Sequence, residues 1–127
     1  MFTPPSAVAH SPPDEEAALE QERPYSVKAV TVLARGTDVL VREFVFAPGE
    51  GTPWHRHEAV RDLCVCVLGE IVLETRAPEG RVTMGPGERA ETPAGQVHRL
   101  VNTGLEDCRL ILIQAGGAYD FQVVDLP

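Results

Sequence analysis

From residue 26 onward the chain is a succession of short apolar and β-branched runs, each ended by turn residues such as Gly, Pro, Asn or Asp. Runs of this kind predict β-strands, and their close spacing is typical of an antiparallel barrel or sandwich. No helical period of useful length follows residue 24. The predicted fold class is therefore all-β. We expect strands over 26–34, 38–47, 54–57, 62–68, 70–75, 81–84, 89–92, 97–102, 108–114 and 119–125.

Residues 1–24 differ from the rest of the chain because prolines and carboxylates dominate them. This composition is typical of an irregular leader, with one short helix expected through Ala17, Ala18 and Leu19. At 127 residues the chain has room for a single core. We therefore divide it into a Pro-rich acidic leader over 1–24 and a β-barrel domain over 25–127.

Three of the four histidines lie in two short segments that also carry regularly placed glycines. Successive side chains of a strand point to opposite faces, so His55 and His57 project to one side and Arg56 to the other. A second strand with His98, and a third beginning at Asp62, could bring further ligands to the same place. Imidazole with one carboxylate suits divalent iron, manganese, nickel, zinc or copper better than calcium or magnesium. Histidines that only pack or cap strands are the alternative.

The spacing within these segments resembles the two signature motifs of the cupin superfamily. The first segment runs from Gly49 through His55, His57 and Asp62 to Gly69, and the second from Gly87 through Pro93, Gly95 and His98 to Asn102. The resemblance covers residues 38–114. It implies a double-stranded β-helix, also called a cupin barrel or jelly roll, with a metal ion near one end. The implied metal ligands are His55, His57, Asp62 and His98.

Asp62 is the one departure, because the family pattern usually has glutamate at this position. The carboxylate of aspartate reaches about 1.5 Å less far. Asp62 therefore either binds the metal after a shift of the backbone, or orients a metal ligand or a water molecule without binding the metal itself. In the second case the metal sits on a face of three histidines, as in some thiol and aromatic-ring dioxygenases of the superfamily.

Strand parity also predicts which residues line a substrate pocket beside the metal. They are Gln96, Leu100, Cys64, Cys66 and Met84. This lining is mostly soft and apolar with few charged groups, so it suits a small aromatic or unsaturated molecule better than a sugar phosphate. For the two cysteines, packing as small hydrophobic side chains is the alternative.

An ion held by three imidazoles and one carboxylate would keep open coordination positions, which a catalytic metal requires. It would also keep a net charge of about plus one, favouring anionic or enolate-like substrates that chelate through oxygen. We therefore expect a metal-dependent enzyme, dioxygenase-like, that acts on a small organic substrate. The fold hosts many functions, so a non-catalytic small-molecule-binding or sensing domain and a metal-dependent isomerase remain alternatives.

Charge and thiol content bear on partners and location. The net charge of −8 disfavours nucleic acid and anionic membrane partners. No apolar run of about 18 residues is present. Three cysteines, an odd number, and a start without a signal-peptide pattern indicate the cytoplasm.

Two apolar segments predict a homodimer. Val30, Val32 and Leu33 in one expected strand, and the tail over 121–126, offer more apolar edge than one small barrel readily covers. Exposed strand edges are commonly protected by pairing with another chain. A monomer whose leader covers these edges is the alternative.

Overall fold

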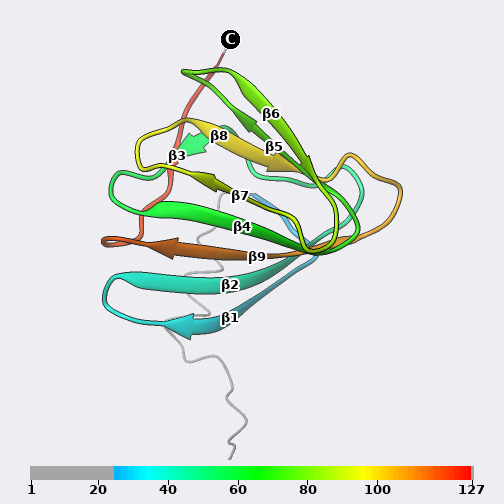
Figure 1. Cartoon of the computed structure of the whole chain (residues 1–127), viewed down its shortest axis with the longest axis horizontal. Helices are drawn as coiled ribbons and strands as arrows, with labels where there is room; N and C mark the ends of the chain where they lie inside the picture. The colour runs from blue at the N-terminus through cyan, green and yellow to red at the C-terminus, as the bar shows by residue number, and fades with distance from the viewer. Residues whose placement is uncertain (1–24, 127) are drawn as a thin grey trace, which may run out of the picture.

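The computed structural model describes residues 25–126, which form two five-stranded antiparallel sheets (Figure 1). One sheet has the strand order β1-β2-β9-β4-β7, and the other has the order β10-β3-β8-β5-β6. Apart from the consecutive pairs β1-β2 and β5-β6, neighbouring strands come from distant parts of the chain, as in a jelly roll. The strands are β1 (Ala29–Arg35), β2 (Val39–Phe46), β3 (His55–Arg56), β4 (Arg61–Leu68), β5 (Ile71–Thr75), β6 (Gly80–Met84), β7 (Arg89–Thr92), β8 (His98–Val101), β9 (Cys108–Ala115) and β10 (Gln122–Val123).

The all-β prediction is confirmed, and each of the expected runs corresponds to one strand. The largest differences lie at the two ends of the barrel domain, where β1 begins at Ala29 and β10 is confined to Gln122–Val123. The helix expected around Ala18 lies outside the described residues. Residues 25–126 contain no helix, and therefore none that is long and apolar enough to cross a membrane.

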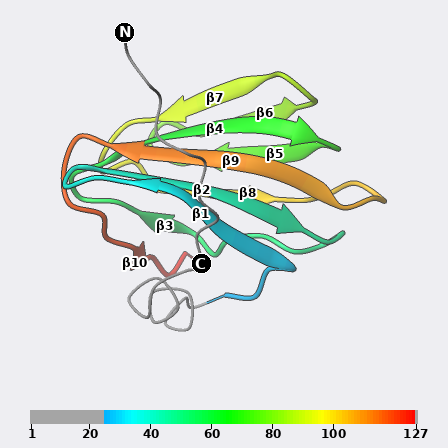
Figure 2. The same cartoon turned by 90° about the horizontal axis from the view of Figure 1, so that it is seen from below.

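The two sheets are stacked, with β6 and β7 at one end of the stack and β1 and β10 at the other (Figure 2). β1 and β10 are each the last strand of their sheet, so each has one unpaired edge within the described chain. Both carry an apolar residue that is half exposed, Leu33 at 50% and Val123 at 51%. A homodimer through these edges stays a prediction.

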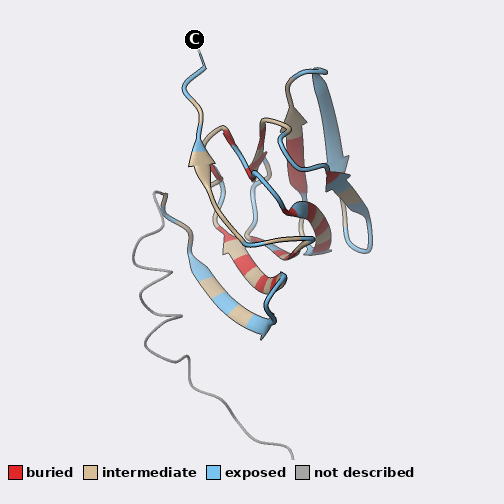
Figure 3. Ribbon diagram, turned by 90° about the vertical axis from the view of Figure 1, so that its left-hand side faces the viewer, coloured by how far each residue is buried: buried red, intermediate tan, exposed pale blue. Residues whose placement is uncertain are grey.

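The core lies between the sheets because inward and outward side chains alternate along each long strand. In β2 every second residue is buried, from Leu40 to Phe46. The same alternation of buried and partly buried residues appears as bands along the ribbon in Figure 3. Phe44, Ile71 and Leu110 are fully buried in this core. Burial of one such side chain contributes about 1.5–3 kcal/mol to stability.

Gly51 allows the segment before β3 to lie against β8. It forms an isolated bridge with Val101, and the amide of Thr52 donates to the carbonyl of Leu100 at 2.8 Å. A Cβ atom on Gly51 would lie 2.3 Å from the Leu100 carbonyl oxygen. Only glycine fits this close approach, which brings β3 beside β8.

Substitution of Gly51 should therefore be far more damaging than substitution of Gly49. Gly49 has a φ of 84°, but a Cβ atom there would meet open space, so Gly49→Ala should lower the free energy of unfolding by only about 1 kcal/mol. Gly51→Ala forces the backbone of β8 to move and should lower it by about 3 kcal/mol. Urea denaturation of both variants measures this difference. Equal losses would show that the close approach does not constrain the fold.

Candidate metal centre

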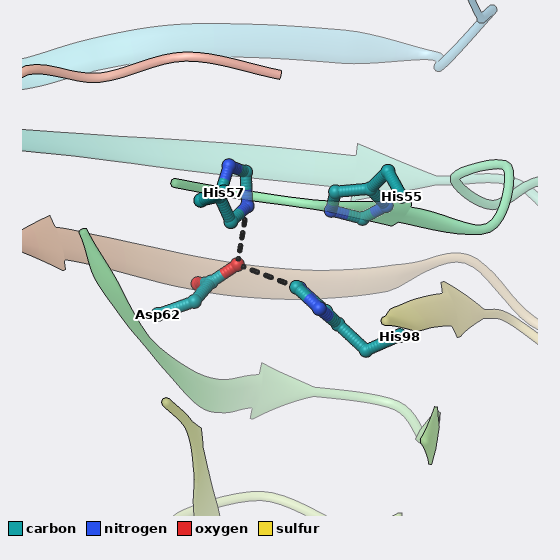
Figure 4. A group of neighbouring side chains, drawn as sticks. All are labelled: His55, His57, Asp62 and His98. Atoms are coloured by element: carbon teal, nitrogen blue, oxygen red, sulfur yellow. Dashed lines mark hydrogen bonds and ion pairs between the residues drawn. The ribbon is translucent and has the colours of Figure 1, made fainter. Parts of the chain in front are cut away.

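Four side chains from both sheets meet between the sheets (Figure 4). His55 on β3 lies directly opposite His98 on β8, because the two residues are register partners. His57 follows β3, and Asp62 comes from the start of β4 in the other sheet. None of the four is more than 4% exposed. The four residues predicted as ligands are thus brought together in a buried cluster.

Each histidine is oriented by a hydrogen bond from Nδ1 to a main-chain carbonyl. The partners are Pro53 for His55 at 2.8 Å, Asp120 for His57 at 2.6 Å and Gln96 for His98 at 2.8 Å. A carbonyl oxygen only accepts, so each Nδ1 carries the proton and donates it. In a neutral ring the lone pair is then on Nε2, which can bind a metal. Metal-binding imidazoles usually donate a hydrogen bond from their other ring nitrogen in this way.

Asp62 lies beside two of the three histidines. Its Oδ2 atom is 3.2 Å from Nε2 of His57 and 3.2 Å from Nε2 of His98 (Figure 4). One candidate ligand atom from each of the four residues lies within 4.8 Å of all the others. Ligands about 2.1 Å from one ion and at right angles are separated by about 3 Å, so this spacing suits a transition metal. The other carboxylate oxygen, Oδ1, is buried without a hydrogen-bond partner among the described residues, which leaves it available to a cation.

The surroundings of the cluster shift the pKa values of His55, His57 and Asp62. Burial, followed by repulsion from His98, lowers the pKa of His55 to about 3, so this ring is neutral near pH 7. Burial acts to raise the pKa of Asp62, but hydrogen bonds with His57 and His98 hold it well below its usual range. Burial opposes the charged form of His57, yet its hydrogen bond with Asp62 raises the pKa of that ring overall. Asp62 is thus ionised and His55 neutral, which are the charge states that a divalent ion requires of these two residues.

Two aromatic rings that the sequence analysis did not identify lie against the histidines. Phe121 stacks on His55 with ring centroids 4.2 Å apart and an angle of 16°. Tyr119 lies 5.6 Å from the ring of His57. Both come from the segment between β9 and β10, and the main chain of Asp120 between them holds His57. Tyr119 and Phe121 are two residues apart in the expected strand 119–125, and this spacing could have indicated that both rings lie on one face.

Arg42 and Gln114 form a second polar group that the sequence analysis missed. Arg42 is 3% exposed and donates from Nη2 to Oε1 of Gln114 at 2.9 Å. The amide of Gln114 in turn lies 3.4 Å from Oδ2 of Asp62. Strand parity could have revealed Arg42, because it lies two residues before Phe44 and therefore on the same inner face of β2. The predicted lining did not include this guanidinium, which lies inside the barrel.

The predicted lining residues divide into two groups. Cys64, Cys66, Met84 and Leu100 all belong to the buried core, where Cys64 follows Asp62 on the inner face of β4. Gln96 lies differently, because its side-chain amide is 3.5 Å from the carbonyl of Pro78 at an exposed position. Gln96 supports the site through its own main-chain carbonyl, which accepts from His98. Contact of these five residues with a substrate stays a prediction.

Comparison with known proteins identifies the family. The model of the cupin domain matches residues 42–114, which is more than half of the chain and includes all four clustered residues. The chain therefore belongs to the cupin family, and the double-stranded β-helix predicted from its two motifs is confirmed. No curated protein sequence matches it.

Solved structures show the same fold at low sequence identity. An oxalate oxidase superimposes with a TM-score of 0.67 at 22% identity, covering 76% of this chain and 54% of its own. A double-stranded β-helix protein from Klebsiella pneumoniae gives 0.68 at 21% identity, with coverages of 85% and 95%. The polyketide cyclase RemF from Streptomyces resistomycificus gives 0.65 at 23% identity, with coverages of 77% and 71%. The chain spans about half of the oxalate oxidase, and these likenesses establish the fold alone.

Removal of one imidazole should abolish tight metal binding. His57→Ala deletes an Nε2 ligand from the cluster and should reduce the metal retained after purification and dialysis by at least about tenfold. Metal content per protein is measured by atomic emission. Arg56→Ala is the matched control, because Arg56 is next to His57 in the chain but exposed. Full retention of metal by His57→Ala would show that the ligand assignment is wrong.

The three cysteines should be unreactive in the folded protein. None is more than 3% exposed, and burial raises the pKa of Cys64 well above its usual range and that of Cys108 to about 11. Thiolate is the reactive form, so a disulfide reagent at pH 8 should modify no thiol within minutes in buffer and three in urea. Rapid labelling of the native protein would instead indicate an accessible thiol at the site.

Proposed function

We propose that the protein is a metal-dependent enzyme, dioxygenase-like, that acts on a small organic substrate at the cluster of His55, His57, Asp62 and His98. The observation that carries the proposal is the set of Nδ1 hydrogen bonds, which leaves the three Nε2 atoms free in a buried cluster whose four candidate ligand atoms, one of them a carboxylate oxygen, lie within 4.8 Å of one another. Three or four protein ligands leave coordination positions free on a six-coordinate ion. A purely structural metal site would be closed.

The chain's own residues have distinct parts in this proposal. The three histidines and Asp62 hold the ion, and the rings of Tyr119 and Phe121 form an apolar wall that keeps water away. A bound divalent metal would supply Lewis-acid chemistry, and redox chemistry with O₂ where it is iron. We assign Asp62 as the fourth ligand, because the position of Oδ2 beside two Nε2 atoms supports direct binding in spite of the shorter side chain.

Oxygen uptake provides the test. Protein loaded with Fe(II) without air and then mixed with a panel of catechols, diketones and thiols should consume O₂ only when a substrate is present. An oxygen electrode records the rate. Protein loaded with Zn(II) is the matched control, since zinc uses the same ligands but has no redox chemistry and should consume none.

The other outcomes assign a different function. Conversion of a compound at equal rates with iron and with zinc, and without O₂, would indicate an isomerase. A rise in the unfolding temperature with a compound that is never converted would indicate a binding or sensing domain. Absence of bound metal after loading would contradict the proposal as a whole.

A further inference from the structure

The guanidinium of Arg42 is buried without an ionic partner among residues 25–126. Its Cζ atom lies over two rings, 5.1 Å from the centroid of Phe44 and 4.7 Å from that of Tyr119. It donates a hydrogen bond to the side chain of Gln114, while its Nε atom is buried and has no partner within the same residues. A guanidinium has five N–H donors in a fixed planar fork. The fork of Arg42 therefore keeps donor capacity that the described chain does not use.

A buried cation of this kind is costly unless an anion satisfies it. Removing an ion from water costs several kcal/mol, which a paired and hydrogen-bonded counter-ion offsets. Within residues 25–126 no carboxylate lies at ion-pair distance from Arg42, and Asp62 is connected to it only through the neutral amide of Gln114. The positive charge of Arg42 is therefore available to an anionic ligand.

The position of Arg42 relates it to the metal cluster. Gln114 contacts Arg42 on one side and Asp62 on the other. Tyr119 likewise contacts both Arg42 and the ring of His57. Gln114 and Tyr119 also line a pocket of about 210 Å³ whose other lining residues are Arg35, Gly36, Thr37, Val39, Leu40 and Gly117. Arg42 thus lies one side chain away from both the cluster and this pocket.

We propose that Arg42 is a substrate-binding residue that selects small organic acids, holding their carboxylate while the opposite end of the same molecule binds the metal. The inference rests on the function proposed above and specifies its substrate class. Planar carboxylates match the guanidinium fork with two parallel hydrogen bonds, which a neutral amide cannot form. The ring of Tyr119, which contacts both Arg42 and His57, supplies an apolar surface for the body of the molecule.

The test compares an acid with its neutral amide on redox-inert protein. The probes are 3,4-dihydroxybenzoate and 3,4-dihydroxybenzamide, whose two hydroxyls chelate a metal at the end opposite the carboxylate or amide. Calorimetry on Zn(II)-loaded protein should show the acid binding at least about tenfold more tightly, the value of one charged hydrogen bond. Zinc content is measured in every sample.

Variants assign the preference to Arg42. Arg42→Gln should bind the acid and the amide equally while retaining its zinc, and Arg42→Lys should keep a smaller preference, because it keeps the charge but loses the fork. Arg109→Gln is the matched control, since it removes the same charge from an exposed arginine paired with Glu43 on the outer face. It should keep the full preference. The unfolding temperature of each variant confirms that it is folded.

The outcomes separate this inference from the function on which it rests. Wild-type protein that holds no zinc contradicts the metal centre itself. Zinc held normally, with equal affinity for acid and amide, overturns the role of Arg42 alone. Loss of zinc from Arg42→Gln also overturns it, because Arg42 would then serve to position Asp62 through Gln114.

Discussion

The candidate site depends on three hydrogen bonds that each join an imidazole Nδ1 to a main-chain carbonyl. Without them an imidazole could rotate or exchange tautomers, and its Nε2 lone pair would have no fixed direction. The carbonyls belong to Pro53, Gln96 and Asp120, which lie before β3, before β8 and before β10. The geometry of the cluster is therefore a property of the loops that lead into the second sheet. The sheet itself contributes the register that sets His55 opposite His98.

The path from Arg42 through Gln114 to Asp62 explains how a cation and an anion are kept apart inside one small barrel. A direct pair between Arg42 and Asp62 would satisfy both charges and draw the carboxylate away from the histidines. The intervening amide accepts from Arg42 and faces Asp62 with its nitrogen, so each charge is partly stabilised while neither is neutralised. With a divalent ion in place, the ion, Asp62 and Arg42 would together carry a charge of about plus two. A ligand with negative charge would balance this positive charge.

Much of the site could be predicted from the sequence because its geometry follows from strand periodicity. The two-residue period places His55 and His57 on one face, and the turn residues mark the ends of nearly all strands. Gln96 precedes β8, so the alternation of the strand does not fix the direction of its side chain, which lies near the carbonyl of Pro78. The burial of Arg42 was not predicted, although its spacing from Phe44 places both on one face of the strand. An arginine in a strand is usually expected to point outward. The stacking of Phe121 on His55 depends on how the last segment crosses the sheet, which local pattern does not encode.

The segment between β9 and β10 contributes both to the support of the histidine cluster and to the lining of the pocket beside Tyr119. Asp120 holds His57 with its carbonyl, accepts the amide of Glu58 on Oδ1 and accepts the side chain of Gln122 on Oδ2. The rings on either side of it, Tyr119 and Phe121, face His57 and His55. A change in this segment therefore moves an aromatic wall and a ligand support together, because one short stretch of main chain carries both.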